Sequence, residues 1–129
     1  MSSGSLLDDL PKAELHLHIE GSLEPELLMT LAKKHKVNLP YASVDEVQAA
    51  YQFDDLQSFL DLYYLGASVL IDEDDFYQLM WQYLLNCKAD NVIHTEIMFD
   101  PQTHTERGID FAVFMNGFAR ALEQAKREW

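Results

Sequence analysis

Two short segments of the sequence have the pattern of β-strands, and a long helical region separates them. In residues 13–19, Leu15 and Leu17 are predicted to lie on one face of a strand, and Glu14, His16 and His18 on the other. Residues 91–99 are rich in β-branched and apolar types. About 70 residues lie between them, and strands joined through helices usually belong to a larger parallel sheet. Two strands alone are marginally stable. We therefore predict an α/β fold in which this chain is a helix-rich part of a longer protein.

The rest of the chain divides into amphipathic helices that begin at capping residues. Apolar side chains recur at helical spacing in each of them, and Ser or Asp precedes each apolar run. We expect helices over residues 22–34, 43–51, 55–70, 72–87 and 110–127, and a loop over residues 100–108. The expected N-caps are Ser22, Ser43, Asp55 (or its neighbour Asp54) and Asp72.

The charge balance limits the partners that such a chain can have. It carries 22 acidic and nine basic residues, for a formal net charge of −13. This charge opposes binding to nucleic acid and to anionic membranes, and fits a small neutral or cationic ligand better. The single cysteine, Cys87, allows no disulfide within the chain, and no apolar run approaches the roughly 18 residues of a membrane span.

The beginning of the chain has no secretory pattern. It lacks a basic segment followed by an apolar one, and we therefore expect a cytoplasmic protein. Residues 1–9 are expected to form a flexible leader, and residues 10–129 the N-terminal portion of a larger domain.

His16 and His18 are the strongest candidates for a functional site. At positions i and i+2 of a strand, both imidazoles project from one face, with Cα atoms about 7 Å apart. Imidazole is a common zinc ligand, and a catalytic zinc takes about three protein ligands and a water. Glu20 continues this polar face, and Gly21 allows a sharp turn beside it. The alternative interpretation is a structural role, because two histidines at this spacing also occur by chance.

The wider sequence resembles the adenosine/adenine deaminase family of the amidohydrolase superfamily. The resemblance begins with Leu10-Pro11-Lys12-Ala13-Glu14-Leu15-His16-Leu17-His18-Ile19-Glu20-Gly21-Ser22-Leu23-Glu24-Pro25. It continues through Leu39-Pro40, Phe59-Leu60, Tyr63-Tyr64 and Phe99-Asp100-Pro101, and it covers nearly all of the chain after the leader. Motifs in this order are far more specific than the two histidines alone.

The resemblance implies the N-terminal part of a (β/α)8 barrel of the TIM type that holds one Zn²⁺ ion. His16 and His18 would bind the zinc together with a third histidine and an aspartate from later strands. A zinc-activated water would attack the amino-bearing carbon of a purine and release ammonia. The catalytic groups of later strands are not in this chain, and we expect the chain alone to be inactive and to hold zinc weakly.

Adenine is the substrate that the resemblance favours. Family members that act on adenosine usually carry Asp at the position of Glu20, and the longer Glu side chain could fill the space of a ribose. The segment from Phe99 to Thr105 is also similar to the adenine deaminase branch. Phe59, with Leu56 and Leu60, resembles the helical segment that covers the purine. Adenosine deamination is the first alternative, and a non-catalytic helical module that binds a partner is the second.

The remaining polar candidates have simpler interpretations. His35 is expected at the surface near a helix end, and His94 and Glu96 inside a barrel. His104, after the second strand, is as easily a substrate contact as a loop residue. Asp72–Asp75 fits the start of a helix, and Cys87 fits a buried position.

Overall fold

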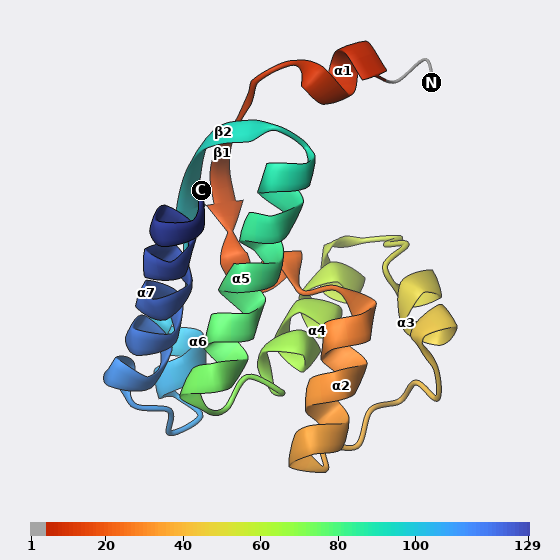
Figure 1. Cartoon of the computed structure of the whole chain (residues 1–129). Coiled ribbons are helices and arrows are strands. Elements are labelled where there is room, and N and C mark those ends of the chain that lie inside the picture. Colours follow the sequence, from red (N-terminus) through yellow and green to blue (C-terminus); the bar gives the residue numbers. More distant parts are fainter. Residues whose placement is uncertain (1–4) are drawn as a thin grey trace.

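The computed structural model describes residues 5–129, and two of its helices lie against one side of a short parallel sheet (Figure 1). The strands are β1, Lys12–His18, and β2, Val92–Met98. The helices are α1 (Ser5–Asp9), α2 (Pro25–His35), α3 (Val44–Ala50), α4 (Leu56–Ala67), α5 (Glu73–Ala89), α6 (Pro101–Thr105) and α7 (Phe111–Glu128). A single 3-10 turn, Ile19–Ser22, follows β1.

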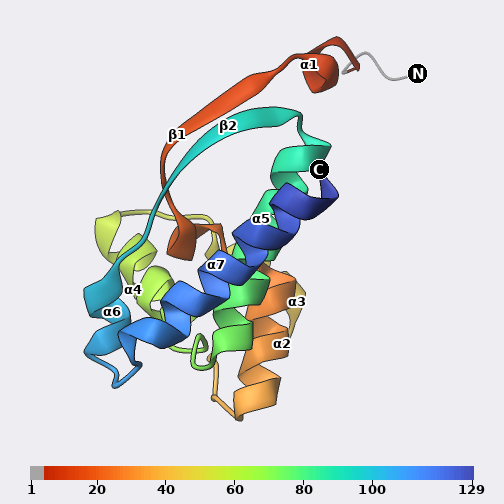
Figure 2. The ribbon, with the colours of Figure 1, turned by 60° about the vertical axis from the view of Figure 1, so that its left-hand side comes forward.

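The parallel pairing of β1 with β2 confirms that helices connect neighbouring strands of one sheet. Helices α5 and α7 pack together along one face of both strands, and Figure 2 shows the strands on one side of this helix pair. Within residues 5–129, no helix covers the opposite face, where Leu15 is 62% exposed and Ile93 is 72% exposed. Helices α2, α3 and α4 gather beyond the carboxyl end of β1 (Figure 1).

The core lies where α5 meets α7 and the turn after β1. Phe76 and Leu79 of α5 are fully enclosed together with Phe114 of α7 and Ile19. Gly117 lets the two helices approach closely, because a Cβ there would lie 2.5 Å from the Glu73 carbonyl oxygen. Cys87 is buried in the same core, as its apolar surroundings in the sequence predict.

Most of the predicted helix starts are confirmed, with one exception, and the structure contains one further helix in a predicted loop. Ser43, Asp55 and Asp72 accept a hydrogen bond from the backbone of the first turn of α3, α4 and α5. Ser22 is not an N-cap, because its hydroxyl donates to the Ile19 carbonyl inside the 3-10 turn, and α2 begins at Pro25. The predicted loop after β2 is wrong in part, since Asp100 caps the short helix α6 there.

Two further findings concern the predicted leader and the question of a membrane-spanning helix. Within the predicted leader, residues 5–9 form helix α1, while residues 1–4 lie outside the described residues. The boundary at residue 9 between a leader and the rest of the chain therefore stays a prediction. Among residues 5–129, no helix combines the length and the apolar character needed to cross a bilayer.

Candidate active site

The end of β1 departs from a regular strand at His16. This residue has a φ of 59°, and two residues of β1 between Glu14 and Leu17 stand opposite one residue of β2. The structure is therefore a β-bulge with a non-glycine residue in the left-handed region, which costs backbone free energy. Bulges often turn a side chain toward a functional site, and here the bulge brings the His16 ring beside that of His18.

The bulge also changes which side chains share a face. Strict alternation places Leu15 on the face of Leu17, and Glu14 on the face of the histidines. Instead, Leu17 packs against the core while Leu15 is exposed, and the Tyr83 hydroxyl of α5 donates to Glu14. That part of the sequence prediction is wrong, because one inserted residue reverses the alternation.

His16 and His18 are placed so that they can hold one metal ion. Their Nε2 atoms lie 3.4 Å apart and both side chains are exposed. Two nitrogen ligands at the Zn–N distance of a tetrahedral site are separated by about 3.3 Å. The two side chains thus fit half of a zinc ligand set.

Glu20 lies directly after these histidines and is buried. Its Oε2 accepts hydrogen bonds from the Asp100 backbone N–H (3.0 Å) and from His104 Nε2 (2.8 Å). Its Oε1 accepts a longer bond, of 3.4 Å, from the Tyr63 hydroxyl. Burial first, and then the nearby charges of Glu20 and Asp100, raises the pKa of Tyr63. Tyr63 therefore remains a hydrogen-bond donor at neutral pH.

A small aromatic cavity of about 100 Å³ opens beside Glu20. Phe59, Leu62 and Tyr63 of α4 line it, and Tyr51 closes another side. Burial raises the pKa of Tyr51 to about 12, and its hydroxyl donates to the Leu23 carbonyl oxygen (2.6 Å). The side chains of this cavity suit a flat aromatic ligand with a polar edge.

The predicted substrate residues are only partly brought together. Glu20 and Phe59 both line the cavity. Leu56 and Leu60 are not among its lining residues, and Leu56 is 71% exposed. Leu62 and Tyr63 are the apolar and aromatic side chains of α4 that line the cavity instead.

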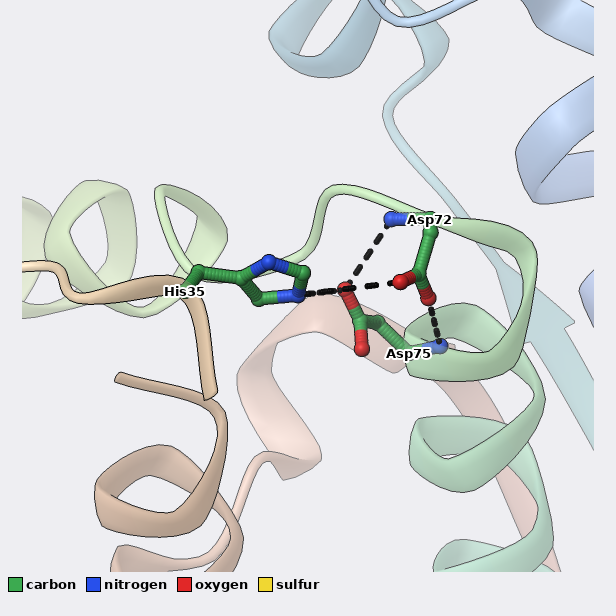
Figure 3. Close-up of side chains that lie close together, drawn as sticks. All are labelled: His35, Asp72 and Asp75. Atoms are coloured by element: carbon green, nitrogen blue, oxygen red, sulfur yellow. Dashed lines mark hydrogen bonds and ion pairs between the residues drawn. The ribbon is translucent and has the colours of Figure 1, made fainter. Parts of the chain in front are cut away.

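A second group of potential metal ligands lies away from this site. One potential ligand atom from each of His35, Asp72 and Asp75, a ring nitrogen and two carboxylate oxygens, lies within 4.8 Å of the other two. Figure 3 shows these side chains together. The Lys34 ammonium already lies 2.8 Å from Asp75 Oδ1 and 3.0 Å from Asp72 Oδ2, in the place that a cation would take. Asp75 Oδ2 also accepts from His35 and from the backbone of Ile71 and Asp72. This cluster is an ion-pair network that joins the end of α2 to the start of α5.

The other predicted candidates have clear positions. His94 and Glu96 are exposed on β2, with His94 Nε2 lying 3.8 Å from Glu96 Oε2. His104 is fully buried in α6 against Glu20, a role that its position in a predicted loop did not suggest. His35 is half-buried rather than a free surface residue, since it contacts Asp75.

Comparison with known proteins gives the family. The family model described as adenosine deaminase matches residues 11–129. An adenine deaminase from Vibrio parahaemolyticus is 64% identical over 124 residues, which are 96% of this chain and 37% of that protein. One from Wolinella succinogenes is 61% identical over 123 residues, 95% of this chain and 37% of that protein. The chain therefore spans just over a third of the length of these relatives.

Solved structures agree with this result. The crystal structure of adenine deaminase from Arthrobacter aurescens matches 92% of this chain and 36% of that one, with 48% identity and a TM-score of 0.85. An amidohydrolase from Burkholderia ambifaria with bound Zn matches 99% of this chain and 36% of that one, with 22% identity and a TM-score of 0.84. The helix-rich fold with its short parallel sheet is thus part of a TIM-type barrel, and the chain belongs to the adenosine deaminase family.

Proposed function

We propose that the whole protein hydrolyses adenine to hypoxanthine and ammonia with the help of one zinc ion. The observation that carries this proposal is the paired Nε2 atoms of His16 and His18, followed directly by Glu20 at a small aromatic cavity. Relatives that are 55–64% identical to the chain are adenine deaminases, which supports adenine as the substrate.

His16 and His18 would hold the zinc, with two further ligands from strands outside this chain. Their spacing fits two positions of a tetrahedral site, and their exposure leaves room for the remaining ligands. When bound, zinc supplies a Lewis acid that activates water for attack on the amino-bearing carbon. The bulge at His16 keeps its imidazole beside that of His18, so little reorganisation is needed on binding.

Glu20 would discriminate between adenine and adenosine. Adenine carries an N–H on its five-membered ring, whereas in adenosine that nitrogen is bonded to ribose. A carboxylate oxygen beside the cavity can accept this N–H, and the same oxygen would meet the ribose of a nucleoside. Phe59 would stack on the base. Contact of Leu56 and Leu60 with the substrate stays a prediction.

Adenosine deamination is the second candidate, since the matching family model carries that description. The two candidates differ in which substrate loses ammonia faster. The negative charge of the chain supports a small-molecule substrate over nucleic acid or an anionic membrane, and the cytoplasm stays the predicted location.

The test uses the complete protein, its zinc content and its turnover of adenine and adenosine. We expect His16→Ala and His18→Ala each to weaken zinc binding by at least about tenfold and to abolish turnover. His94→Ala is the control for zinc content, because His94 is an exposed strand histidine whose ring lies beside Glu96. Retention of zinc by both alanine variants would disprove the ligand assignment. A protein that holds zinc but deaminates neither purine would disprove the enzymatic function.

A further inference from the structure

The buried histidine of α6 has an unusually complete set of contacts. His104 is fully enclosed, and its ring contacts those of Phe76 and Phe114 at centroid distances of 4.9 and 5.2 Å. Its Nε2 lies 2.8 Å from Glu20 Oε2. Full burial against these two rings leaves the imidazole little freedom to rotate, so packing fixes the direction of this hydrogen bond.

Arg107 determines which nitrogen of His104 carries the hydrogen. Its Nη2 lies 3.3 Å from His104 Nδ1, and a guanidinium can only donate. Nδ1 must then accept, which leaves the hydrogen on Nε2, where Glu20 receives it. Arg107 is itself held by the carbonyl oxygens of Leu70 (2.8 Å) and Thr103 (3.3 Å).

Glu20 is thereby fixed through one oxygen only. The Asp100 backbone N–H and His104 both donate to Oε2. Among the described residues, the only hydrogen bond to Oε1 is the long one from Tyr63, which itself lines the cavity. Oε1 is therefore the oxygen on the cavity side, and it retains most of its capacity to accept a hydrogen bond.

We propose that His104 and Arg107 are positioning residues that hold Glu20 with Oε1 toward the purine and so set the preference for the free base over its nucleoside. This inference rests on the proposed function. Without the Nε2 donor, the Glu20 side chain can rotate about its own bonds. A rotated carboxylate no longer meets the ring N–H of adenine, and it also vacates the space that a ribose needs.

The experiment compares purine kinetics of four variants in the complete zinc-loaded protein. His104→Leu removes the donor and keeps an apolar side chain against Phe76 and Phe114. His104→Gln keeps an N–H donor near the position of Nε2. Arg107→Met removes the donor to Nδ1. His35→Gln is the matched control, since it weakens another buried histidine–carboxylate contact that lies outside the cavity lining.

We expect His104→Leu to raise KM for adenine about tenfold, to change kcat by less than about threefold, and to leave the zinc content unchanged. The ratio of kcat/KM for adenine to that for adenosine should fall about tenfold. His104→Gln should bring both the KM for adenine and this ratio close to their wild-type values. Arg107→Met should lower the ratio about threefold, and His35→Gln should leave it unchanged.

The outcomes separate this inference from the proposed function. A wild-type protein that turns over neither purine and binds no hypoxanthine in a calorimetric titration overturns both. Wild-type adenine turnover with an unchanged ratio in His104→Leu overturns the positioning role alone. Equal losses in His104→Leu and His35→Gln also overturn it, because they indicate a general effect of stability. If His104→Leu does not fold, Arg107→Met takes its place. A wild-type ratio of kcat/KM for adenine to that for adenosine in Arg107→Met then overturns the positioning role.

Discussion

Two buried carboxylates of this chain each contact a histidine, yet their surroundings differ. Asp75, at the start of α5, has donors on both oxygens. Lys34 donates to Oδ1, and two backbone N–H groups donate to Oδ2. His35 also lies against Oδ2 (Figure 3). Glu20, at the end of β1, has two strong donors, both on Oε2. The second carboxylate therefore keeps an oxygen for a ligand, and the first does not.

The comparison shows how a structural carboxylate is distinguished from a functional one. Burial and a histidine partner are common to both residues, so neither feature identifies a site. The distinguishing feature is unused acceptor capacity at a cavity. Asp75 has four donors, and each of its oxygens has at least one strong donor, of which the one on Oδ1 is the Lys34 ammonium.

The largest expected effect comes from converting Asp75 to its amide. Asp75→Asn replaces one oxygen by an NH₂ group, which must face either Lys34 or the backbone N–H groups of Ile71 and Asp72. Donor then meets donor at a buried position, and we expect a loss of about 3 kcal/mol in the free energy of unfolding. Urea unfolding of the variant and the wild type measures this loss. A loss below about 1 kcal/mol would show that the cluster does not hold α2 to α5.

The sequence predicts the helices and strands that carry Asp75 and Glu20 better than it predicts the contacts of these two side chains. The strands, five of the helices and three capping residues follow from periodicity and from side chains that compete for backbone hydrogen bonds. Asp72 is recognisable as an N-cap because its partner lies three residues away. Local patterns of this kind are visible in a linear sequence.

The features that the sequence does not predict depend on contacts between residues that are distant in the chain. Asp75 contacts Lys34 and His35 across 41 and 40 positions, and Glu20 contacts His104 across 84. The bulge at His16 reverses the face of Glu14 and Leu15, and no glycine marks it. Helix α6 is short, and its signal, Asp100 before Pro101, is also typical of a turn. Tertiary packing decides such features.

A smaller effect is expected from acid. Burial opposes the charge on Asp75, but hydrogen bonds from Lys34 and from the backbone N–H groups of Asp72 and Ile71 hold the pKa of Asp75 below its ordinary value. A carboxyl with a lowered folded-state pKa stabilises the fold above its unfolded pKa of about 3.9. That contribution is lost as the pH falls through the folded pKa. Unfolding free energies measured from about pH 5 downward should fall less steeply for Asp75→Asn than for the wild type. Parallel slopes would contradict this assignment.

The smallest effect on stability is expected from the same amide change at the other carboxylate. In Glu20→Gln, the carbonyl oxygen can take the place of Oε2 and accept from both Asp100 and His104, while the NH₂ group takes the place of Oε1 and donates to the Tyr63 oxygen. No pair of donors is forced together, so the free energy of unfolding should change by less than about 1 kcal/mol. On the cavity side, however, an acceptor has become a donor, so adenine should lose at least about tenfold in kcat/KM. Urea unfolding and adenine kinetics on the same preparation measure both quantities. Destabilisation as large as that of Asp75→Asn would mean that Oε1 is already occupied within the fold, and Glu20 would then be a structural carboxylate like Asp75.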